Sequence, residues 1–328
     1  MAGKQTFFPE FAVTVGKKKL KSGGQGSLWR LEILREVNGG ADEAFLQLGV
    51  TQPLDAKPGD DVAIDLGYAG ALSRVFTGTV ERMSGGLASL EVHALGSQAP
   101  LMRKRGDKAF VNQKAGEVFQ ALASDGGAQS VQAQAGVSMS FYLADSAYSH
   151  WEHGLRLGLH SGNDVYADAQ GKLIFAPISG TTPPVKLKFG VDLLQAACEN
   201  GAAPGKAILI PESPASSSGE ETANWIAKDS SPHKGEAGSG DGGPRYHPFL
   251  RTQEHAQASA DCLLLRRRRE ARNAEVEMLG RPDVELGDSV ELQGLPAGGD
   301  GTYVVLALRH ALGLHSGFRT YASLGGVP

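Results

Sequence analysis

Stretches in which every second residue is apolar dominate the first hundred residues of the chain. Val62, Ile64 and Leu66 alternate with polar or small neighbours directly after the turn signal Lys57-Pro58-Gly59-Asp60. This pattern is typical of a strand with one buried face. Residues 75–83 and 87–95 are two further apolar stretches separated by Ser84-Gly85-Gly86, which predicts a β-hairpin. Several short strands at this spacing predict a small β-barrel over residues 1–100.

The spacing of the apolar residues changes after Pro100. Over 115–122 they recur every three or four residues, which predicts a helix that Gly126 ends. A second helix is expected to begin near Ser146 and to end by Gly162, with an apolar face of Trp151, Leu155 and Leu159. Because two strands are expected next, at 164–168 and 172–175, residues 101–180 are predicted to form an α/β insert.

The last part of the chain, residues 181–328, is predicted to be β-structure with one interruption. Strands are expected at 185–189 and 206–210. Residues 211–250 then contain 6 Gly, 7 Ser and 5 Pro, a composition typical of a loop. Thr252 is a candidate N-cap for a helix that reaches about residue 272. Apolar residues that alternate over 274–325 predict the final β region.

A repeat connects the two β regions. Gly59-Asp60-Asp61-Val62-Ala63-Ile64 is echoed by Gly287-Asp288-Ser289-Val290-Glu291-Leu292, and in each copy a second strand begins after a glycine. Gly-Asp before a strand is also common turn chemistry, so coincidence is the alternative. A true repeat predicts a mainly β fold in which two similar small tube-type β-barrels flank an α+β insert. The repeat positions are Gly59, Asp60, Val62, Ile64, Gly67 and Gly78 in the first copy and Gly287, Asp288, Val290, Leu292, Gly294 and Gly301 in the second.

Composition narrows the classes of function. Glycine supplies 44 of the 328 residues and is spread along the whole chain, which indicates many tight turns between short strands. The net charge of −4 argues against a dedicated nucleic-acid binder, because such domains are usually basic. Two cysteines are too few for a disulfide framework or a zinc site. With no apolar run of membrane-span length, we expect a soluble protein made in a reducing cytoplasm and not inserted in a membrane.

Candidate chemistry is sparse. His150, His153 and His160 are the one cluster of potential metal ligands, but their helix carries packing residues and matches no zinc signature. Residues 238–243 satisfy GxGxxG without a strand before them or a helix after them. Ser216-Ser217-Ser218 has no base fixed beside it. We therefore predict no catalytic, cofactor-binding or metal-binding residue, no cofactor, and a protein that is not an enzyme.

The run Arg266-Arg267-Arg268-Arg269 is the strongest basic feature. Four consecutive residues of a helix point in all directions, so they cannot form one stripe that follows a phosphate backbone. A solvated or subunit-pairing face is favoured over specific nucleic-acid binding.

Three segments together resemble a known family. They are 59–80, with Gly59-Asp60 and Gly78-Thr79-Val80; 149–173, with Ser149-x-Trp151-Glu152 and Gly171-Lys172-Leu173; and 279–320, with Gly287-Asp288 and Gly301-Thr302-Tyr303. In this order they are similar to the late-control protein D family of phage baseplate hub proteins, to which the N-terminal hub part of type VI secretion spike proteins is related.

The resemblance implies a homotrimer with pseudo-sixfold symmetry in the baseplate of a virion tail, made and assembled in the cytoplasm of the bacterial host. Such a hub joins the hexameric tail tube protein to a trimeric spike protein, and it can contact the tape measure and other baseplate proteins. Because the chain ends directly after the second barrel, the spike is expected to be a separate polypeptide. Two alternatives stay open: the hub of an extracellular contractile injection system or tailocin, and a tail enzyme that degrades cell wall or glycan.

Candidate interface residues lie in the last β region. Residues 303–308 are apolar on both alternating faces, so one face is expected in the core and the other in a subunit contact. The C-terminal residues 325–328 are expected to contact the spike. The candidate interface set is Tyr303, Val305, Arg309, His310, Phe318, Gly325 and Pro328.

Overall fold

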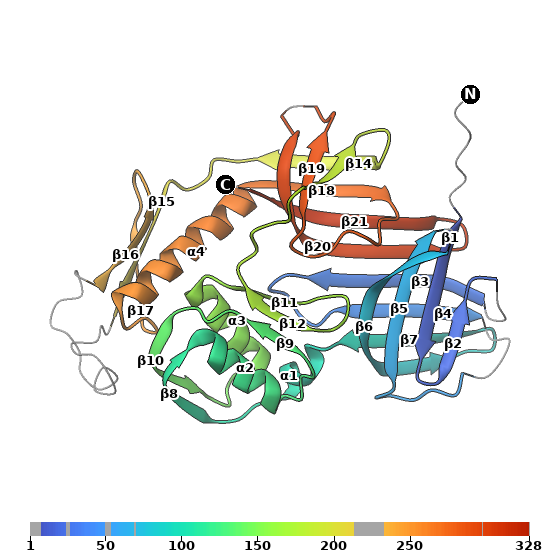
Figure 1. Cartoon of the computed structure of the whole chain (residues 1–328), viewed down its shortest axis with the longest axis horizontal. Helices are drawn as coiled ribbons and strands as arrows, with labels where there is room; N and C mark the ends of the chain where they lie inside the picture. The colour runs from blue at the N-terminus through green and yellow to red at the C-terminus, as the bar shows by residue number, and fades with distance from the viewer. Residues whose placement is uncertain are drawn as a thin grey trace.

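A sheet of 13 strands is the largest element of the protein. The computed structural model describes residues 8–23, 27–49, 54–68, 70–212, 233–296 and 298–327. All neighbouring strands of the large sheet are antiparallel except β13 and β19. The helices and three smaller sheets lie to one side of it (Figure 1). The prediction of a mainly β fold with a helical insert is therefore confirmed.

The first half of the large sheet curls round a core of its own. Its strand order is β3-β4-β7-β6-β5-β1-β2, and β1 and β5 cross in front of β3, β4 and β7 in Figure 1. The side chains of Val62, Ile64 and Leu66 on β5 are completely buried, because their alternation gives that strand one apolar face. The strands are β1 (Pro9–Val15), β2 (Lys18–Lys21), β3 (Ser27–Glu36), β4 (Glu43–Gly49), β5 (Asp61–Tyr68), β6 (Ala71–Gly85) and β7 (Ser89–Gly96).

The second half has a similar order round a separate core. It runs β14-β18-β21-β20, with β19 on β20 and β13 on β19. Val290 and Leu292 of β19 lie in this core, as their counterparts Val62 and Ile64 lie in the first. The strands are β13 (Val185–Lys188), β14 (Leu193–Asn200), β18 (Arg272–Leu279), β19 (Ser289–Gln293), β20 (Gly301–Gly313) and β21 (Gly317–Gly326).

The two halves, each with its own core, are joined in one sheet. Residues 307–313 of β20 pair with residues 30–36 of β3, so that Ala307 is opposite Glu36 and Gly313 is opposite Arg30. One hydrogen-bonded ladder therefore joins strands that lie about 270 positions apart in the sequence, and the sheet continues from one half into the other.

The insert, which lies between the two halves in the sequence, has a third hydrophobic core of its own. Phe119 of α2 stacks on Phe175 of β12 with ring centroids 4.8 Å apart, and the buried indole of Trp151 donates a hydrogen bond of 2.8 Å to the carbonyl of Gly39 in the first half. Its elements are α1 (Ala99–Arg103), β8 (Lys108–Lys114), α2 (Ala115–Asp125), β9 (Val131–Ala133), β10 (Ser138–Ala144), α3 (His150–Ser161), β11 (Asp164–Ala167) and β12 (Leu173–Ala176).

Helix α3 differs from its prediction in both start and buried face. It begins at His150 rather than near Ser146, because Ser149 and Glu152 form a capping box. Its buried face holds Gly154 and Gly158 beside Trp151 and Leu157, whereas Leu155 and Leu159 are half-buried. The apolar spacing misplaced this face because glycine and histidine do not count as hydrophobic.

Residues 206–212 and 233–271 form a small unit, of which the sequence predicted the first strand and the helix but not the two strands between them. Strands β15 (Lys206–Pro211), β16 (Gly235–Gly238) and β17 (Pro244–His247) make a sheet covered by helix α4 (Gln253–Ala271). Its core includes Leu209, Leu250 and Leu264. Helix α4 also packs on α3 of the insert (Figure 1). The interpretation of 211–250 as a loop is therefore wrong for β16 and β17, and residues 213–232 lie outside the described residues.

We expect Gly158→Ala to destabilise the protein, although alanine normally favours a helix. A Cβ atom at Gly158 would lie 2.8 Å from the carbonyl oxygen of Asn163 and 2.7 Å from Cγ2 of Val165, so the free energy of unfolding should fall by about 1–3 kcal/mol. Urea denaturation measures this change. Gly106→Ala is the control, because nothing lies within 4 Å of its added Cβ. Equal stability of the two variants would contradict the close packing of α3.

Candidate assembly surface

The Gly-Asp turns of the repeat have the same geometry in both halves. Gly59 and Gly287 have φ of 91° and 85°, in the region that favours glycine. Asp60 Oδ2 accepts a hydrogen bond from the Lys57 amide at 3.0 Å, and Asp288 Oδ2 accepts one from the Glu285 amide at 2.9 Å. The Gly59 amide donates to Val80, as the Gly287 amide donates to Val305. Each turn thus fixes where its two strands start to pair.

The other two glycine pairs of the repeat do not occupy matching places. Val62 pairs with Gly78 in the first half, whereas Val290 pairs with Tyr303 in the second and Gly301 pairs with Leu292. The structural counterpart of Gly78 is therefore Tyr303, two residues after the Gly301 that the sequence repeat paired with it. Gly67 lies inside β5, whereas Gly294 follows β19 with a φ of 79°.

The outward face of the large sheet carries ionic contacts across the seam between the halves. Arg309 of β20 donates to Glu32 of β3 at 3.0 Å and lies 3.9 Å from the ring centroid of Tyr321 on β21. Burial raises the pKa of Glu32, but hydrogen bonds from Arg309 and Arg30 outweigh it and lower that pKa overall. This face therefore presents paired charges from both halves of the chain.

A groove follows the seam on the same face. Its deeper part encloses about 540 Å³ and is lined by side chains that include Leu34, Glu36, Glu43 and Tyr321. An adjoining hollow of about 440 Å³ shares Glu36 and Glu275 with it and reaches Arg266. Both acidic and basic side chains line the groove, among them Glu36, Glu275 and Arg309.

Buried Arg35 ties three parts of the chain together. From β3 of the first half it donates to Glu285 of the second half at 2.8 Å and to the carbonyl of Ala167 in the insert at 3.1 Å. It also faces Asp42 at 3.4 Å. Burial raises the pKa of Asp42 to about 6, although the guanidinium of Arg35 opposes that rise. The alternation of Leu31 and Ile33 places position 35 on the buried face, but Arg35 was not predicted to be buried, because a charged side chain is almost never buried without a partner.

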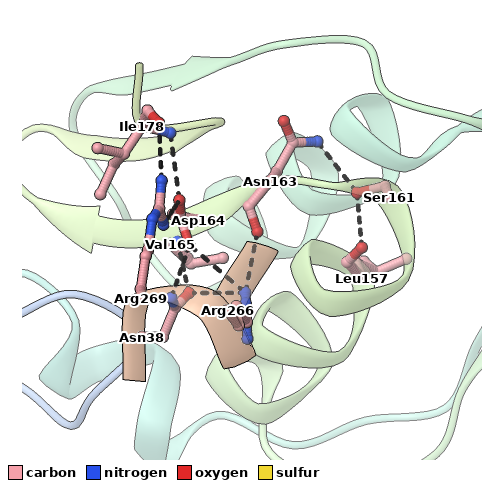
Figure 2. A network of polar contacts seen from close by, with 9 residues as sticks. All are labelled: Asn38, Leu157, Ser161, Asn163, Asp164, Val165, Ile178, Arg266 and Arg269. Atoms are coloured by element: carbon pink, nitrogen blue, oxygen red, sulfur yellow. Dashed lines mark hydrogen bonds and ion pairs between the residues drawn. The ribbon is translucent and has the colours of Figure 1, made fainter. Parts of the chain in front are cut away.

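A second network, drawn in Figure 2, centres on Asp164 at the start of β11. Its carboxylate accepts hydrogen bonds from Arg269 at 3.1 Å, from the Ile178 amide at 3.1 Å and from Asn38 at 2.9 Å. Arg266 donates to the carbonyl of Asn163 at 3.2 Å. The prediction of a solvated or subunit-pairing face is therefore wrong for Arg266 and Arg269, which bind the insert and the first half of the same chain.

Most of the predicted interface residues are buried within the single chain. Tyr303 and Val305 lie in the core of the second half, and Phe318 lies in that of the first. His310 is 1% exposed and contacts Thr320 at 3.0 Å, and Gly325 pairs with Val304 inside the sheet. Only Arg309 of the described set has an exposed side chain, and Pro328 lies outside the described residues. The second apolar face of residues 303–308 is thus covered by the chain itself.

The predicted chemistry residues are separated by the fold. His150 contacts Asp125 at 2.8 Å, and His153 contacts the Tyr142 hydroxyl at 2.7 Å. His160 instead packs against His247, with ring centroids 4.4 Å apart. The GxGxxG stretch joins β16 to β17, two strands with no helix between them. Ser216-Ser217-Ser218 lies outside the described residues.

The described part of the chain has neither a metal-binding cluster nor a membrane-spanning helix. No group of three or more His, Cys, Asp or Glu side chains there is arranged to hold a metal ion. Within the same residues, no helix has the length and apolar character needed to cross a membrane.

Comparison with known proteins rests on structure. No protein-family model matches the chain, and no curated protein sequence matches it. A tail protein of prophage MuSo2 from Shewanella oneidensis is similar, with a TM-score of 0.71 and 17% identity over 96% of this chain and 98% of that one. A tail protein from Neisseria meningitidis MC58 also has a TM-score of 0.71, with 15% identity over 97% of each chain.

A third similar structure comes from a secretion system. It is an Escherichia coli component of the type VI secretion system, with a TM-score of 0.58 and 13% identity over 96% of this chain and 77% of that one. Each likeness extends over nearly the whole of the present chain, insert included. The chain therefore has the fold shared by these phage tail proteins and the type VI secretion component, in agreement with its resemblance to the hub family.

Proposed function

We propose that this chain is the structural hub of a phage tail baseplate, a homotrimer that joins the hexameric tail tube to a trimeric central spike. The observation that carries the proposal is the pairing of β20 with β3, which places two similar halves side by side in one sheet. Three such chains present six similar halves around one axis. A ring of this kind has the sixfold character of a tube on one side and the threefold character of a spike on the other.

The buried charges favour a structural role over a catalytic one. Arg35, Asp164 and Arg269 are almost completely buried, and each is held by hydrogen bonds to another part of the chain. Such groups fix the insert and the two halves in one arrangement. The tail tube, the spike, the tape measure and other baseplate proteins are the proposed partners, and the virion tail baseplate is the proposed location.

The hub of a tailocin or extracellular injection system is the second candidate. It is supported by the likeness to a component of the type VI secretion system, a protein with this fold that belongs to a secretion system. Capsid and terminase genes beside the gene for this chain would support the phage; their absence would support the second candidate.

Native mass spectrometry tests the proposed assembly. We expect the purified chain to have three times the mass of one copy, alone or after addition of its candidate spike, because a hub must match a threefold spike. Negative-stain images of the same sample should show a ring with a threefold axis. A monomer under both conditions would overturn the proposal. Clearing of a cell-wall or glycan gel by the purified chain would favour the enzyme alternative instead.

A further inference from the structure

Strands β6 and β20 occupy equivalent positions in the two halves, and both contain a β-bulge at the same place. In the first half the pairing of β6 with β7 shifts between Val80 and Arg82, and in the second half the pairing of β20 with β21 shifts between Val305 and Ala307. Val80 and Val305 also accept the matching hydrogen bonds of the two Gly-Asp turns. Since a bulge sets the register of a strand, Arg82 corresponds to Ala307 and Ser84 to Arg309.

The two strands differ in what lies along the edge beyond the bulge. On β20, β19 covers residues 301–304 and β3 covers residues 307–313. On β6, β5 covers residues 71–79, and no strand of the described chain pairs with residues 82–85 on that side. An unpaired edge of backbone N–H and C=O groups is a ready site for another strand. The first half thus leaves open the place that β3 fills in the second.

Strand β14 is the counterpart of β3. Each is the outer strand of its half, next to β4 in one case and β18 in the other, and β4 and β18 in turn pair with the equivalent strands β7 and β21. The unit of β15–β17 and α4 is inserted between β14 and β18, and the Gly201 amide closes it with a hydrogen bond of 2.6 Å to the carbonyl of Ala271. Within the described residues, β14 has no partner strand on its outer edge.

We propose that the open edge of β6 in one copy pairs with the outer edge of β14 in a neighbouring copy of this chain. This inference rests on the proposed trimer and specifies its contact. The register follows from the seam within one chain, where Arg309 is opposite Leu34 and His310 is opposite Ile33. The ladders β3-β4-β7 and β14-β18-β21 are equivalent, so Leu34 of β3 corresponds to Glu199 of β14 and Ile33 to Cys198. The same register between copies places Ser84 opposite Glu199 and Gly85 opposite Cys198.

The charges of the two edges are complementary. In this register Arg82 is the diagonal neighbour of Glu199, a distance that long side chains of opposite charge span in a sheet. Arg82 is exposed and makes no ion pair within the described residues, and Glu199 is exposed at the end of β14. A contact between two different edges closes into a ring when the rotation between copies closes, as the proposed threefold axis requires. Three copies would then contain six similar junctions, three within chains and three between them.

A disulfide between copies tests the register. The variant Ser84→Cys/Glu199→Cys, made with Cys198→Ser, should give covalent dimers and trimers under mild oxidation, with the trimer as the largest species on a non-reducing gel. Opposite residues of neighbouring strands have the spacing that a disulfide needs. Either single cysteine variant should stay monomeric on that gel. A mixture of the two single variants should yield covalent dimers, since each supplies one edge.

Charge reversal gives a second measurement. Arg82→Glu and Glu199→Arg should each weaken the trimer in native mass spectra, and the double exchange should restore it. Circular dichroism of each variant checks that the chain folds. A trimer that neither crosslinks nor responds to these changes would overturn the proposed edges while the hub proposal stands. A folded, monomeric wild-type chain would overturn the hub proposal itself, and the edge contact with it.

Discussion

Asp164→Ala should lower the free energy of unfolding by about 3–5 kcal/mol, the usual cost of leaving a buried partner charge without its counterion. The side chain of Arg269 is 6% exposed and has its ion pair with Asp164 at 3.1 Å. Removal of the carboxylate also leaves the Ile178 amide and the Asn38 side chain without an acceptor. Guanidinium denaturation followed by circular dichroism measures the loss.

Asp283→Ala is the matched control for Asp164→Ala. Its carboxylate also binds an arginine, Arg281, at 2.8 Å, but the side chain of Asp283 is 54% exposed. Exposed pairs contribute at most about 1 kcal/mol, so this variant should remain close to the wild type. A double variant Asp164→Ala/Arg269→Met should recover part of the loss, because it removes the unpaired charge. Equal losses for Asp164→Ala and Asp283→Ala would contradict the role of the network in joining the insert to the two halves.

Acidification from pH 7 to pH 5 should weaken the fold by about 5 kcal/mol through the four buried groups with the largest pKa shifts. Burial lowers the pKa of His160 and of His310 to about 3 and that of His255 to about 4. Well above pH 6.5 these rings are neutral in both states, so they contribute little pH dependence there. Below it the unfolded chain takes up protons that the folded chain excludes, which costs about 2 kcal/mol per ring at pH 5. Asp42, with its raised pKa of about 6, offsets about 1 kcal/mol.

Denaturation at a series of pH values measures this dependence. His310→Asn is the informative variant, because it keeps a polar group near Thr320 and removes the titrating ring. Between pH 5 and pH 6.5 its free energy of unfolding should vary less steeply than that of the wild type. The difference should equal the contribution of one histidine ring, about 2 kcal/mol at pH 5. An unchanged slope would show that His310 is protonated in the folded protein, against its burial.

Local patterns predicted the elements that bury one apolar face. The alternation at residues 62–66 is that of β5, and the helical spacing at 115–122 lies in α2, which ends at Asp125 before Gly126. Both elements face one core each, so the period of their apolar residues equals the period of their structure. Strands β16 and β17 gave no such signal, because each has only four residues: β16 contains two glycines and packs on α4, and β17 is mostly exposed.

The sequence by itself determined the class of the fold, the order of its parts and the two Gly-Asp turns, since turn chemistry and apolar period act between residues close in the chain. Only the tertiary structure decided what the last strands contact. The second apolar face of β20 suggested a partner copy, yet Tyr303, Val305 and His310 are covered by their own chain. Arg35 and Arg269 are likewise buried by segments more than a hundred residues away. Long-range pairing of this kind leaves no local period, because the partner of each residue is chosen by packing rather than by its neighbours in sequence.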